Sequence, residues 1–439
     1  MIPILIDANT NDRAALARLL GRLRLDVRSM LFDEGSLQKE NEYVRKILVD
    51  VARRGDAALI DIIHRFDDPN FDPKRLRVTT DEMREATSRI SGHLIDAIRR
   101  SIAQVREYQT RILPPEVSFD ARPGVKLGLR HTPIDSAGIY VPGGKASYPS
   151  SLIMLAVPAQ VAGVKRIAVC SPAGKFGDSD LVYAAAHELG IGEFYRVGGV
   201  GAIGALACGT ESINPVDKIL GPGNTYVQLA KRLVSGAVGV DGFLGPSEIL
   251  VVADDSCVPE FVAADLLAQA EHDPGRCIFL TRSQAIAHRV ADAIASQLKQ
   301  CLRSAAIEKA LVNDSAIVIC ESDERIADLA NQFAAEHVNL QVREPAKWLE
   351  TIRHAGAFFV GTHAPVAAGD YVAGPSHCLP TNTTARFGGG VSVYEFLKRT
   401  GIVHYERSGL KDDSVAIIAL ATAEGLDAHA ASVTIRSKQ

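Results

Sequence analysis

The chain has 439 residues, of which 47% are hydrophobic and 23% are charged, with a formal net charge of −4. This length exceeds one ordinary hydrophobic core, and the small negative charge without long Lys/Arg runs excludes nucleic acid and anionic membrane as natural partners. No apolar run approaches the roughly 18 residues that span a bilayer, the first residues lack a secretory pattern, and seven scattered cysteines match neither a disulfide framework nor a cysteine zinc cluster. We therefore expect a cytoplasmic globular protein.

The first quarter of the chain is predicted to be helical. Apolar residues recur at three and four positions throughout residues 12–112, with breaks at Gly, Pro and Asp clusters. The Leu113-Pro114-Pro115 segment ends this part, and two short strands are expected at 126–130 and 137–141.

From residue 138 the pattern changes to strands alternating with helices. In the first run we predict strands at 166–170, 193–197 and 218–220, with helices at 150–162, 181–189, 202–207 and 225–234. In the second run we predict strands at 248–253, 277–281, 316–320, 338–341 and 357–360, with helices at 259–273, 283–301 and 323–335. A final helix is expected at 414–425. Such alternation predicts doubly wound α/β domains with parallel sheets.

The helix predicted at 259–273 ends with two polar side chains on one face. Gln269 and His272 are three residues apart, just before Pro274-Gly275 stops the helix. An amide oxygen and an imidazole could be two ligands of one metal ion. The alternative is that both are ordinary capping or surface groups.

Two glycine-rich turns follow predicted strands. Gly199 to Gly204 has the GxGxxG spacing of a dinucleotide site, but no acidic residue follows at a suitable distance, and the alternative is a plain strand-to-helix turn. Gly221-Pro-Gly-Asn224 precedes another helix, whose first N–H groups could bind an anion. Asn224 could contact that ligand or simply cap the helix.

Three further acid and imidazole pairs could carry chemistry. Glu336-His337 stands at a helix-to-strand junction, where a carboxylate and an imidazole could divide two proton transfers, and where ligands would bind if the junction lies on the carboxyl side of the sheet. Asp370 shares a polar Gly/Pro loop with His377, and Glu424 is close to His429 near the end of the chain. The alternative for each pair is a solvated surface or a capped terminus.

Together these segments resemble the histidinol dehydrogenase family over nearly the whole chain. The resemblance is carried by nine motifs in the same order: GIYVPGG (138–144), YPSSLIMLAVPAQVAGV (148–164), VDKILGPGN (216–224), LGPSEILVVAD (244–254), LLAQAEHDP (266–274), AAEHVNLQ (334–341), GDYVAGPSHCLPT (369–381), ARFGGGVSVYEFLKRT (385–400) and AEGLDAHAASVTIR (423–436).

The resemblance implies an NAD-dependent homodimer with one Zn²⁺ per subunit, which oxidises L-histidinol to L-histidine in the last step of histidine biosynthesis. It implies that the zinc ligands are Gln269, His272, Asp370 and, from the other subunit, His429. The catalytic pair implied is Glu336 and His337. The implied substrate-binding residues are Ser247, Gln269, His272, His337, Asp370, Glu424 and His429, with Glu424 also supplied across the dimer.

In the implied chemistry, His337 takes the hydroxyl proton while NAD accepts hydride, and Glu336 activates water to attack the enzyme-held aldehyde before a second NAD is reduced. Tyr140 and Asn224 match NAD-contacting positions. Gly201 stands where the family usually has Gln in a GGAQA motif, so the GxGxxG match arises from a departure at a cofactor-binding position.

The resemblance implies two incomplete Rossmann-like α/β domains, a helical N-terminal part and a small C-terminal dimerisation tail. The predicted boundaries are an N-terminal helical segment at 1–28, a first domain with the zinc and catalytic residues at 29–139 and 247–391, an inserted NAD-side domain at 140–246, and a tail at 392–439 that is swapped in the dimer.

Three other functions stay open at this point. One is a zinc- and NAD-dependent dehydrogenase of another small polar alcohol, such as a sulfonate diol, although Glu424 favours a substrate with an ammonium group. A second is a zinc-dependent hydrolase in which Glu336 activates water. The third is a nucleotide-binding protein without catalysis, which the Glu336-His337 pair argues against.

Overall fold

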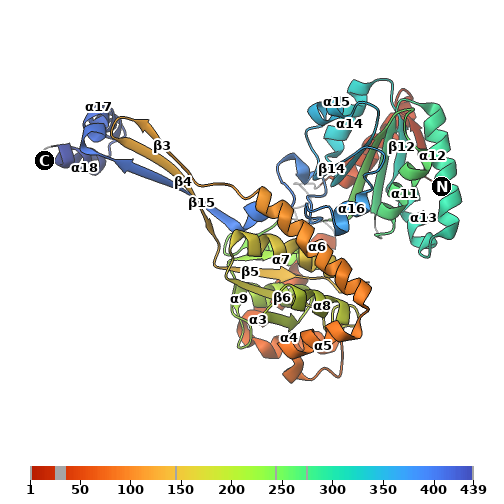
Figure 1. The fold of residues 1–439 in the computed structure, drawn as a ribbon, viewed down its shortest axis with the longest axis horizontal. Helices are drawn as coiled ribbons and strands as arrows, with labels where there is room; N and C mark the ends of the chain where they lie inside the picture. The colour runs from red at the N-terminus through yellow and green to blue at the C-terminus, as the bar shows by residue number, and fades with distance from the viewer. Residues whose placement is uncertain (1, 25–35, 144–145, 243–244, 273–274, 438–439) are drawn as a thin grey trace.

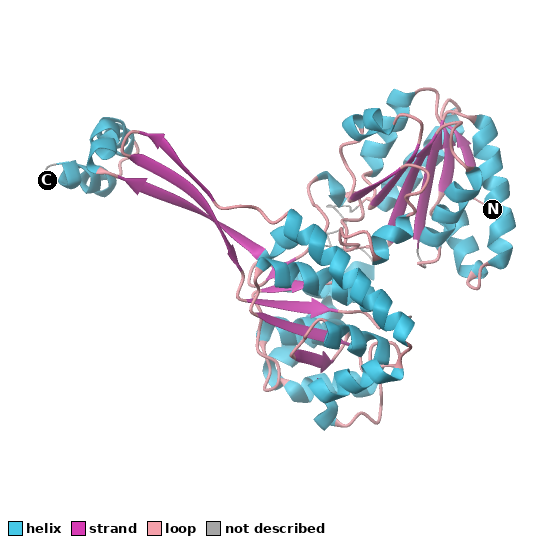
Figure 2. Cartoon of the chain, viewed as in Figure 1, coloured by secondary structure: helices cyan, strands magenta, loops and turns pink. Residues whose placement is uncertain are grey.

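The computed structural model describes residues 2–24, 36–143, 146–242, 245–272 and 275–437. These residues form two α/β lobes and a long arm that projects away from both (Figure 1, Figure 2). The first lobe comprises residues 2–23 and 247–372, the second lobe comprises 36–111 and 136–240, and the arm comprises 117–133 and 397–437.

The first lobe is built on a parallel sheet with the strand order β1-β12-β11-β10-β13-β14. Its strands are β1 (Ile4–Ile6), β10 (Ser247–Ala253), β11 (Gly275–Thr281), β12 (Ala316–Ile319), β13 (His337–Gln341) and β14 (Ala357–Val360). Its helices are α1 (Thr10–Leu23), α11 (Pro259–Ala270), α12 (Gln284–Gln297), η2 (Leu298–Gln300), α13 (Ser304–Asn313), α14 (Asp323–Phe333), α15 (Pro345–Thr351) and α16 (Val366–Tyr371).

Alternate residues of the buried strands supply two separate cores. On β10, Ile249 and Val251 pack with α11, α12 and α13, whereas Leu250 and Val252 pack with α1, α14 and α15. This alternation follows from the two-residue repeat of a strand, and it explains why the sequence there is continuously apolar.

The second lobe has the strand order β2-β7-β6-β5-β8-β9, with β2 antiparallel to β7 and the other pairings parallel. Its strands are β2 (Arg77–Val78), β5 (Ser136–Tyr140), β6 (Arg166–Ser171), β7 (Glu193–Arg196), β8 (Lys218–Leu220) and β9 (Gly239–Val240). One face carries α5 (Thr80–Arg89), α6 (Gly92–Arg111), α7 (Pro149–Ala162) and α8 (Asp180–Glu188). The other carries α3 (Ser36–Arg54), α4 (Asp56–Phe66), α9 (Gly199–Cys208) and α10 (Thr225–Val234), and η1 (Pro73–Arg75) precedes β2.

The arm is an antiparallel sheet that ends in a helical tip. The strand order is β15-β4-β3, and the elements are β3 (Val117–Arg122), β4 (Val125–Pro133), β15 (Leu397–Tyr405), α17 (Arg407–Ala423) and α18 (Asp427–Ser437). Along the chain, the short helices η3 (Thr384–Arg386) and η4 (Val393–Phe396) come between the first lobe and the arm, and Val393 and Phe396 belong to the core of the second lobe. Every residue of β3 is exposed, so this sheet lacks the layer that would cover it within one chain.

The structure groups the segments differently from the predicted boundaries. The helices at 36–111, which were assigned with 247–391, pack on the second sheet, and β1 with α1 joins the first sheet instead of forming a separate segment at 1–28. The arm also takes residues 117–133 from the predicted first domain. An amphipathic pattern shows that a helix must bury one face, but it does not specify which of two sheets receives it.

The α/β fold class is as predicted, and most predicted strands and helices are present. Helix α11 ends at Ala270, three residues before the expected end, and residues 273 and 274 lie outside the described residues, as do Gly144 and Leu244 of the motifs. None of the helices in the described ranges combines the length and the apolar character needed to cross a membrane.

Candidate active site

The candidate residues of the first lobe meet at the amino edge of its sheet. Ser247 and His337 are the first residues of β10 and β13, and Ala357, the first residue of β14, pairs with His337. Helices α11 and α16 follow strands and run back, so their last turns, with Gln269 and Asp370, reach the same edge. From the sequence, ligands are expected near Glu336-His337 only if this helix-to-strand junction lies at the carboxyl edge of the sheet. The condition is not met, because the chain enters β13 at this point and the junction therefore lies at the amino edge.

Glu336 and His337 are held in fixed orientations by β10. The Glu248 N–H donates to Glu336 Oε2 at 2.8 Å, and His337 Nδ1 lies 3.0 Å from the Glu248 carbonyl oxygen. A carbonyl only accepts, so Nδ1 carries the proton and Nε2 keeps a free lone pair. Glu336 is 5% exposed and His337 is 4% exposed, so water is largely excluded from both residues.

Burial shifts the pKa of each member of this pair in the direction that favours its neutral form. It lowers the pKa of His337 to about 4, and it raises the pKa of Glu336 well above the usual range, helped by the negative charges of Glu248 and Asp370. Glu336 Oε2 lies 3.5 Å from His337 Nδ1, and because the imidazole is neutral at pH 7 this contact is not an ion pair. An imidazole that is neutral at pH 7 is ready to accept a proton.

His272 and Asp370 lie close enough to shift each other's pKa, and Gln269 lies in the last turn of α11 at the same edge of the sheet. Gln269 is 3% exposed, and its Nε2 has no hydrogen-bond partner among the described residues. His272 stays exposed at the mouth of the site, yet the surrounding protein lowers its pKa, while the charge of Asp370 opposes that change. Burial in turn raises the pKa of Asp370, and the proximity of His272 lowers it.

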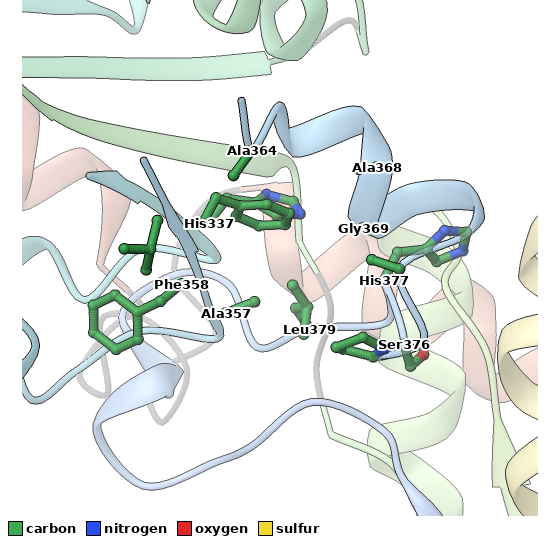
Figure 3. A pocket seen from close by; sticks show the side chains of 13 residues that line it. His337, Ala357, Phe358, Ala364, Ala368, Gly369, Ser376, His377 and Leu379 are labelled. Atoms are coloured by element: carbon green, nitrogen blue, oxygen red, sulfur yellow. The ribbon is translucent and has the colours of Figure 1, made fainter. Parts of the chain in front are cut away.

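A cavity of about 180 Å³ lies next to His337. Its other walls are mainly aliphatic and aromatic side chains from β14, α16 and the loop that follows, and Figure 3 shows His337 and His377 as imidazoles among them. His377 Nδ1 donates to the Asp370 carbonyl oxygen at 2.9 Å, and Nε2 lies 3.2 Å from the Ser151 hydroxyl of the second lobe. His377 was noted in the sequence only as part of a polar loop, and it proves to contact the chain at Asp370.

Glu248, whose N–H donates to Glu336, belongs to a charged network with Arg276 and Asn382. Glu248 Oε1 accepts from Arg276 Nη1 at 2.9 Å and from the Asn382 N–H at 3.0 Å. Burial raises the pKa of Glu248 to about 7, although Arg276 lowers it. Asn382 and Thr383 have positive φ angles of 54° and 67°, which cost free energy in residues other than glycine. Sequence reasoning missed this network because its members are far apart along the chain.

The predicted cofactor residues lie at the carboxyl edge of the second sheet. Tyr140 ends β5, is buried, and its hydroxyl accepts from the Gly199 N–H at 3.3 Å. Asn224 is exposed and caps α10, since its side chain accepts from the Val227 N–H at 3.1 Å. Gly201 is buried, and a Cβ atom there would lie 3.2 Å from Ile62 Cδ1, so this glycine serves the close packing of α9 against α4.

A buried ion pair fixes the turn between these positions. Lys231 and Asp241 have fully buried side chains and are bonded to each other. Lys231 Nζ donates to the Gly221 carbonyl oxygen at 3.1 Å, and the Gly221 N–H donates to Asp241 Oδ2 at 2.7 Å. Gly221 has a φ of 131° and approaches Tyr140 so closely that a Cβ atom would lie 2.1 Å from the Tyr140 carbonyl oxygen. The pair therefore holds the turn that begins the Gly221-Asn224 motif.

Glu424 and His429 do not reach the rest of the site within one chain. They are exposed at the end of α17 and in α18, at the tip of the arm and far from the first lobe (Figure 1). No group of three or more His, Cys, Asp or Glu side chains that could hold a metal occurs within the described residues. One chain therefore supplies only part of the predicted ligand set.

The donors that one chain does bring together are nevertheless suited to zinc. An amide oxygen, an imidazole and a carboxylate are all zinc ligands, and a site with three protein ligands leaves a position for a fourth. The unpartnered amide of Gln269 is the observation that fits best, because a buried polar group without a partner costs free energy and a metal ligand removes that cost. The assignment of its oxygen and nitrogen can be reversed without disturbing another bond.

The chain is similar over its whole length to known proteins of one family. The profile of the family described as histidinol dehydrogenase matches residues 33–437. The chain is 45% identical over 413 residues to a histidinol dehydrogenase of Gluconobacter oxydans, covering 94% of this chain and 96% of that protein. It is 44% identical over 429 residues to one of Thermosynechococcus vestitus, covering 97% of each. The crystal structure of histidinol dehydrogenase from Elizabethkingia anophelis superposes with a TM-score of 0.91 at 33% identity, covering 100% of this chain and 98% of that one.

Proposed function

Because the chain belongs to the histidinol dehydrogenase family and is thus an oxidoreductase, we propose that it oxidises L-histidinol to L-histidine in two steps, with two NAD reduced. This is a four-electron oxidation through an enzyme-held aldehyde, and we place it last in histidine biosynthesis. The observation that carries the proposal is the meeting of Glu336 and His337 with Gln269, His272 and Asp370 at one edge of the sheet.

His337 is the base for the first oxidation. Its Nδ1 proton is engaged by the Glu248 carbonyl, so Nε2 is available for the substrate hydroxyl proton. The pKa of about 4 keeps the imidazole neutral before the reaction. As the hydroxyl proton moves to His337, the carbon that bears the hydroxyl would give hydride to NAD, and the alcohol becomes an aldehyde.

Glu336 is the base for the second oxidation. Because the pKa of Glu336 is raised, its ionised carboxylate binds a proton more tightly than that of an ordinary glutamate. It is therefore the stronger base towards water. Glu336 takes a proton from the water that adds to the aldehyde, and the hydrate would then give hydride to a second NAD and release its protons to leave the carboxylate. The buried position of both residues retains the aldehyde between the steps.

Two bound groups complete the site. Gln269, His272 and Asp370 of one chain and His429 of a second would hold zinc, one ion per subunit, and Tyr140, Asn224 and the helix beginning at Gly199 would contact NAD. When bound, these groups supply a cationic anchor for the imidazole and amine of the substrate and an acceptor for hydride. Ser247 lies beside Glu336 and would contact the substrate, and the loss of a side chain at Gly201 alters the cofactor side.

The working form is a homodimer in which each arm completes the site of the other chain. Support comes from the exposed arm, whose tip carries Glu424 and His429, and from exposed apolar side chains along it, including Phe119, Val403 and Val415. Glu424 would pair with the substrate ammonium group. The cysteines in the described residues are all free, which suits a reducing cytoplasm.

The test is the stoichiometry of the reaction. Purified protein is incubated with L-histidinol and NAD, and NADH is counted against histidine formed; the proposal requires two NADH per histidine. Turnover of another polar alcohol, such as a sulfonate diol, without turnover of histidinol would move the assignment to that substrate. Ester or amide cleavage without NAD would move it to a hydrolase.

A variant separates the two steps. Glu336→Gln keeps the shape of the side chain but removes the carboxylate, so aldehyde should form at close to the parent rate while its oxidation slows by about 10²–10⁴-fold. Equal loss of both steps would contradict the assignment of water activation to Glu336.

A further inference from the structure

Three elements carry the candidate residues of the first lobe, and they share one buried polar contact. Asp265 lies on α11 one turn before Gln269, and it is 6% exposed. Its Oδ2 accepts from Asn339 Nδ2 at 2.8 Å, and its Oδ1 accepts from the Val366 N–H at 3.3 Å. Val366 is the first residue of α16, so one carboxylate contacts β13 and α16 from α11.

Each of the three elements carries candidate site residues a short way from this contact. Asn339 follows His337 by two residues on β13 and therefore points to the same side of the sheet. Asp370 lies four residues beyond Val366 on α16, and Gln269 lies four residues beyond Asp265 on α11. Asn339 Nδ2 also donates to the Ala364 carbonyl oxygen at 3.2 Å, which ties the start of α16 to β13 a second time.

The surroundings of this contact are apolar. Val262, Leu266 and Val366 belong to the core on this side of the sheet, and Asn339 is fully buried. Burial raises the pKa of Asp265 to about 6 even though two groups donate to its carboxylate. An apolar residue of similar size would avoid the cost of burying this charge, so its presence is not explained by stability.

We propose that Asp265 is a positioning residue that, through Asn339 and the Val366 N–H, aligns Gln269 and Asp370 with His337. The inference rests on the proposed function, because it concerns the residues assigned to the metal and to proton transfer. Apolar contacts between α11, α16 and the sheet are non-directional and tolerate small sliding movements, whereas two hydrogen bonds to one carboxylate fix the elements against each other. A metal site needs that alignment, because residues behind the ligands change metal affinity by about 10–100-fold.

The test measures zinc binding to the metal-free dimer, by competition with a chelator, together with the free energy of unfolding. Asp265→Asn is nearly isosteric, but its NH₂ group cannot accept a hydrogen bond. Either it faces a donor and one bond to residue 265 is lost, or the Asn339 amide turns and loses its bond to the Ala364 carbonyl oxygen. Asn339→Ala removes the β13 side chain that donates to the Asp265 carboxylate. Ser315→Ala is the matched control. Ser315 is buried in the same lobe and accepts from the Cys277 N–H at 3.1 Å, but it is not part of the contact between Asp265, Asn339 and Val366.

We expect the zinc dissociation constant to rise about 10–100-fold in Asp265→Asn and to rise in Asn339→Ala, with no change in Ser315→Ala even where its stability falls. A dissociation constant in Asp265→Asn within twofold of the parent would overturn the inference. So would failure of both network variants to fold while Ser315→Ala folds, because the contact would then belong to the framework of the lobe.

His272→Ala distinguishes this inference from the proposed function. If His272→Ala still binds zinc like the parent, the metal site itself has been assigned to the wrong residues. If His272→Ala loses zinc while Asp265→Asn retains it, only the positioning role of Asp265 is lost.

Discussion

The two parts of the candidate site are built in opposite ways. At the amino edge of the first sheet, Glu336, His337 and Gln269 are almost fully buried and held by strands and helix ends, whereas Glu424 and His429 stand exposed on the tip of the arm. A site needs its groups fixed before the substrate binds, and only the first part meets that need within one chain. The difference fits our proposal that the chain carries a preorganised half-site and a separate half that docks on another copy.

The largest effect is expected from breaking the buried half at His337. His337→Asn keeps a donor for the Glu248 carbonyl but lacks the Nε2 lone pair, so the first oxidation should slow by about 10²–10⁴-fold while the fold is retained. Pre-steady-state NADH formation measures this step, and His404→Asn, on the exposed strand β15, is the control. A loss of less than tenfold would exclude His337 as the base.

Ion pairs provide a second way to compare lobe and arm. Lys231→Met leaves the Asp241 carboxylate buried without a cation and should lower the free energy of unfolding by about 3–5 kcal/mol. Arg122→Met removes the arm pair of Arg122 with Asp413, whose side chains are 45% and 26% exposed, and should change the free energy of unfolding far less, because solvent screens the pair. Urea titrations measure both, and similar costs would show that the two parts do not differ in this respect.

The exposed apolar side chains of the arm should matter for association and not for folding. Val403→Ser replaces a side chain that is 69% exposed, and loss of its burial in a dimer should weaken association by about 1.5–3 kcal/mol, or about 10–100-fold. Sedimentation equilibrium measures this change. Val49→Ser, on the second lobe, should leave association unaltered, and an equal effect of the two substitutions on association would argue against docking through the arm.

The smallest effect concerns strain next to the buried half-site. Thr383 has a φ of 67°, a conformation that β-branched residues rarely adopt. Thr383→Gly should raise the free energy of unfolding by about 1 kcal/mol, whereas Thr384→Gly, at ordinary backbone geometry, should lower it. Thermal unfolding with both variants decides this, and a loss of stability in Thr383→Gly would show that the turn is not strained.

Much of the fold could be predicted from local patterns, because they report on local structure. The alternation of buried residues on β10 and the helical spacing in α11 both have direct physical causes that the sequence displays. The assignment of the helices at 36–111 to a sheet could not be predicted, since burial of one face leaves the partner unspecified. Strand β15 was missed because its exposed residues lack an apolar alternation.

The site was predicted through motifs, and its supporting contacts were not. Glu336, His337 and the last turn of α11 were identified as candidates, but the amino edge was not, because the edge depends on the direction in which the chain enters β13. His377 contacts Ser151 of the second lobe, and Asp241 pairs with Lys231 across a turn; neither contact follows from a local sequence pattern. Asp265 did leave a signal: a charged residue stands at helical spacing between Val262 and Gln269, on the buried face of the helix.

The most direct test of a site shared between two chains is complementation between two inactive variants. His272→Ala damages the half-site of its own chain, and His429→Ala damages the arm. If each arm completes the other chain's site, a mixed dimer contains one site with both parts intact. Unfolding and refolding an equal mixture should therefore restore about a quarter of the parent activity, since half of the dimers are mixed and one of their two sites is whole. Activity in the mixture no greater than in either variant alone would contradict the shared site.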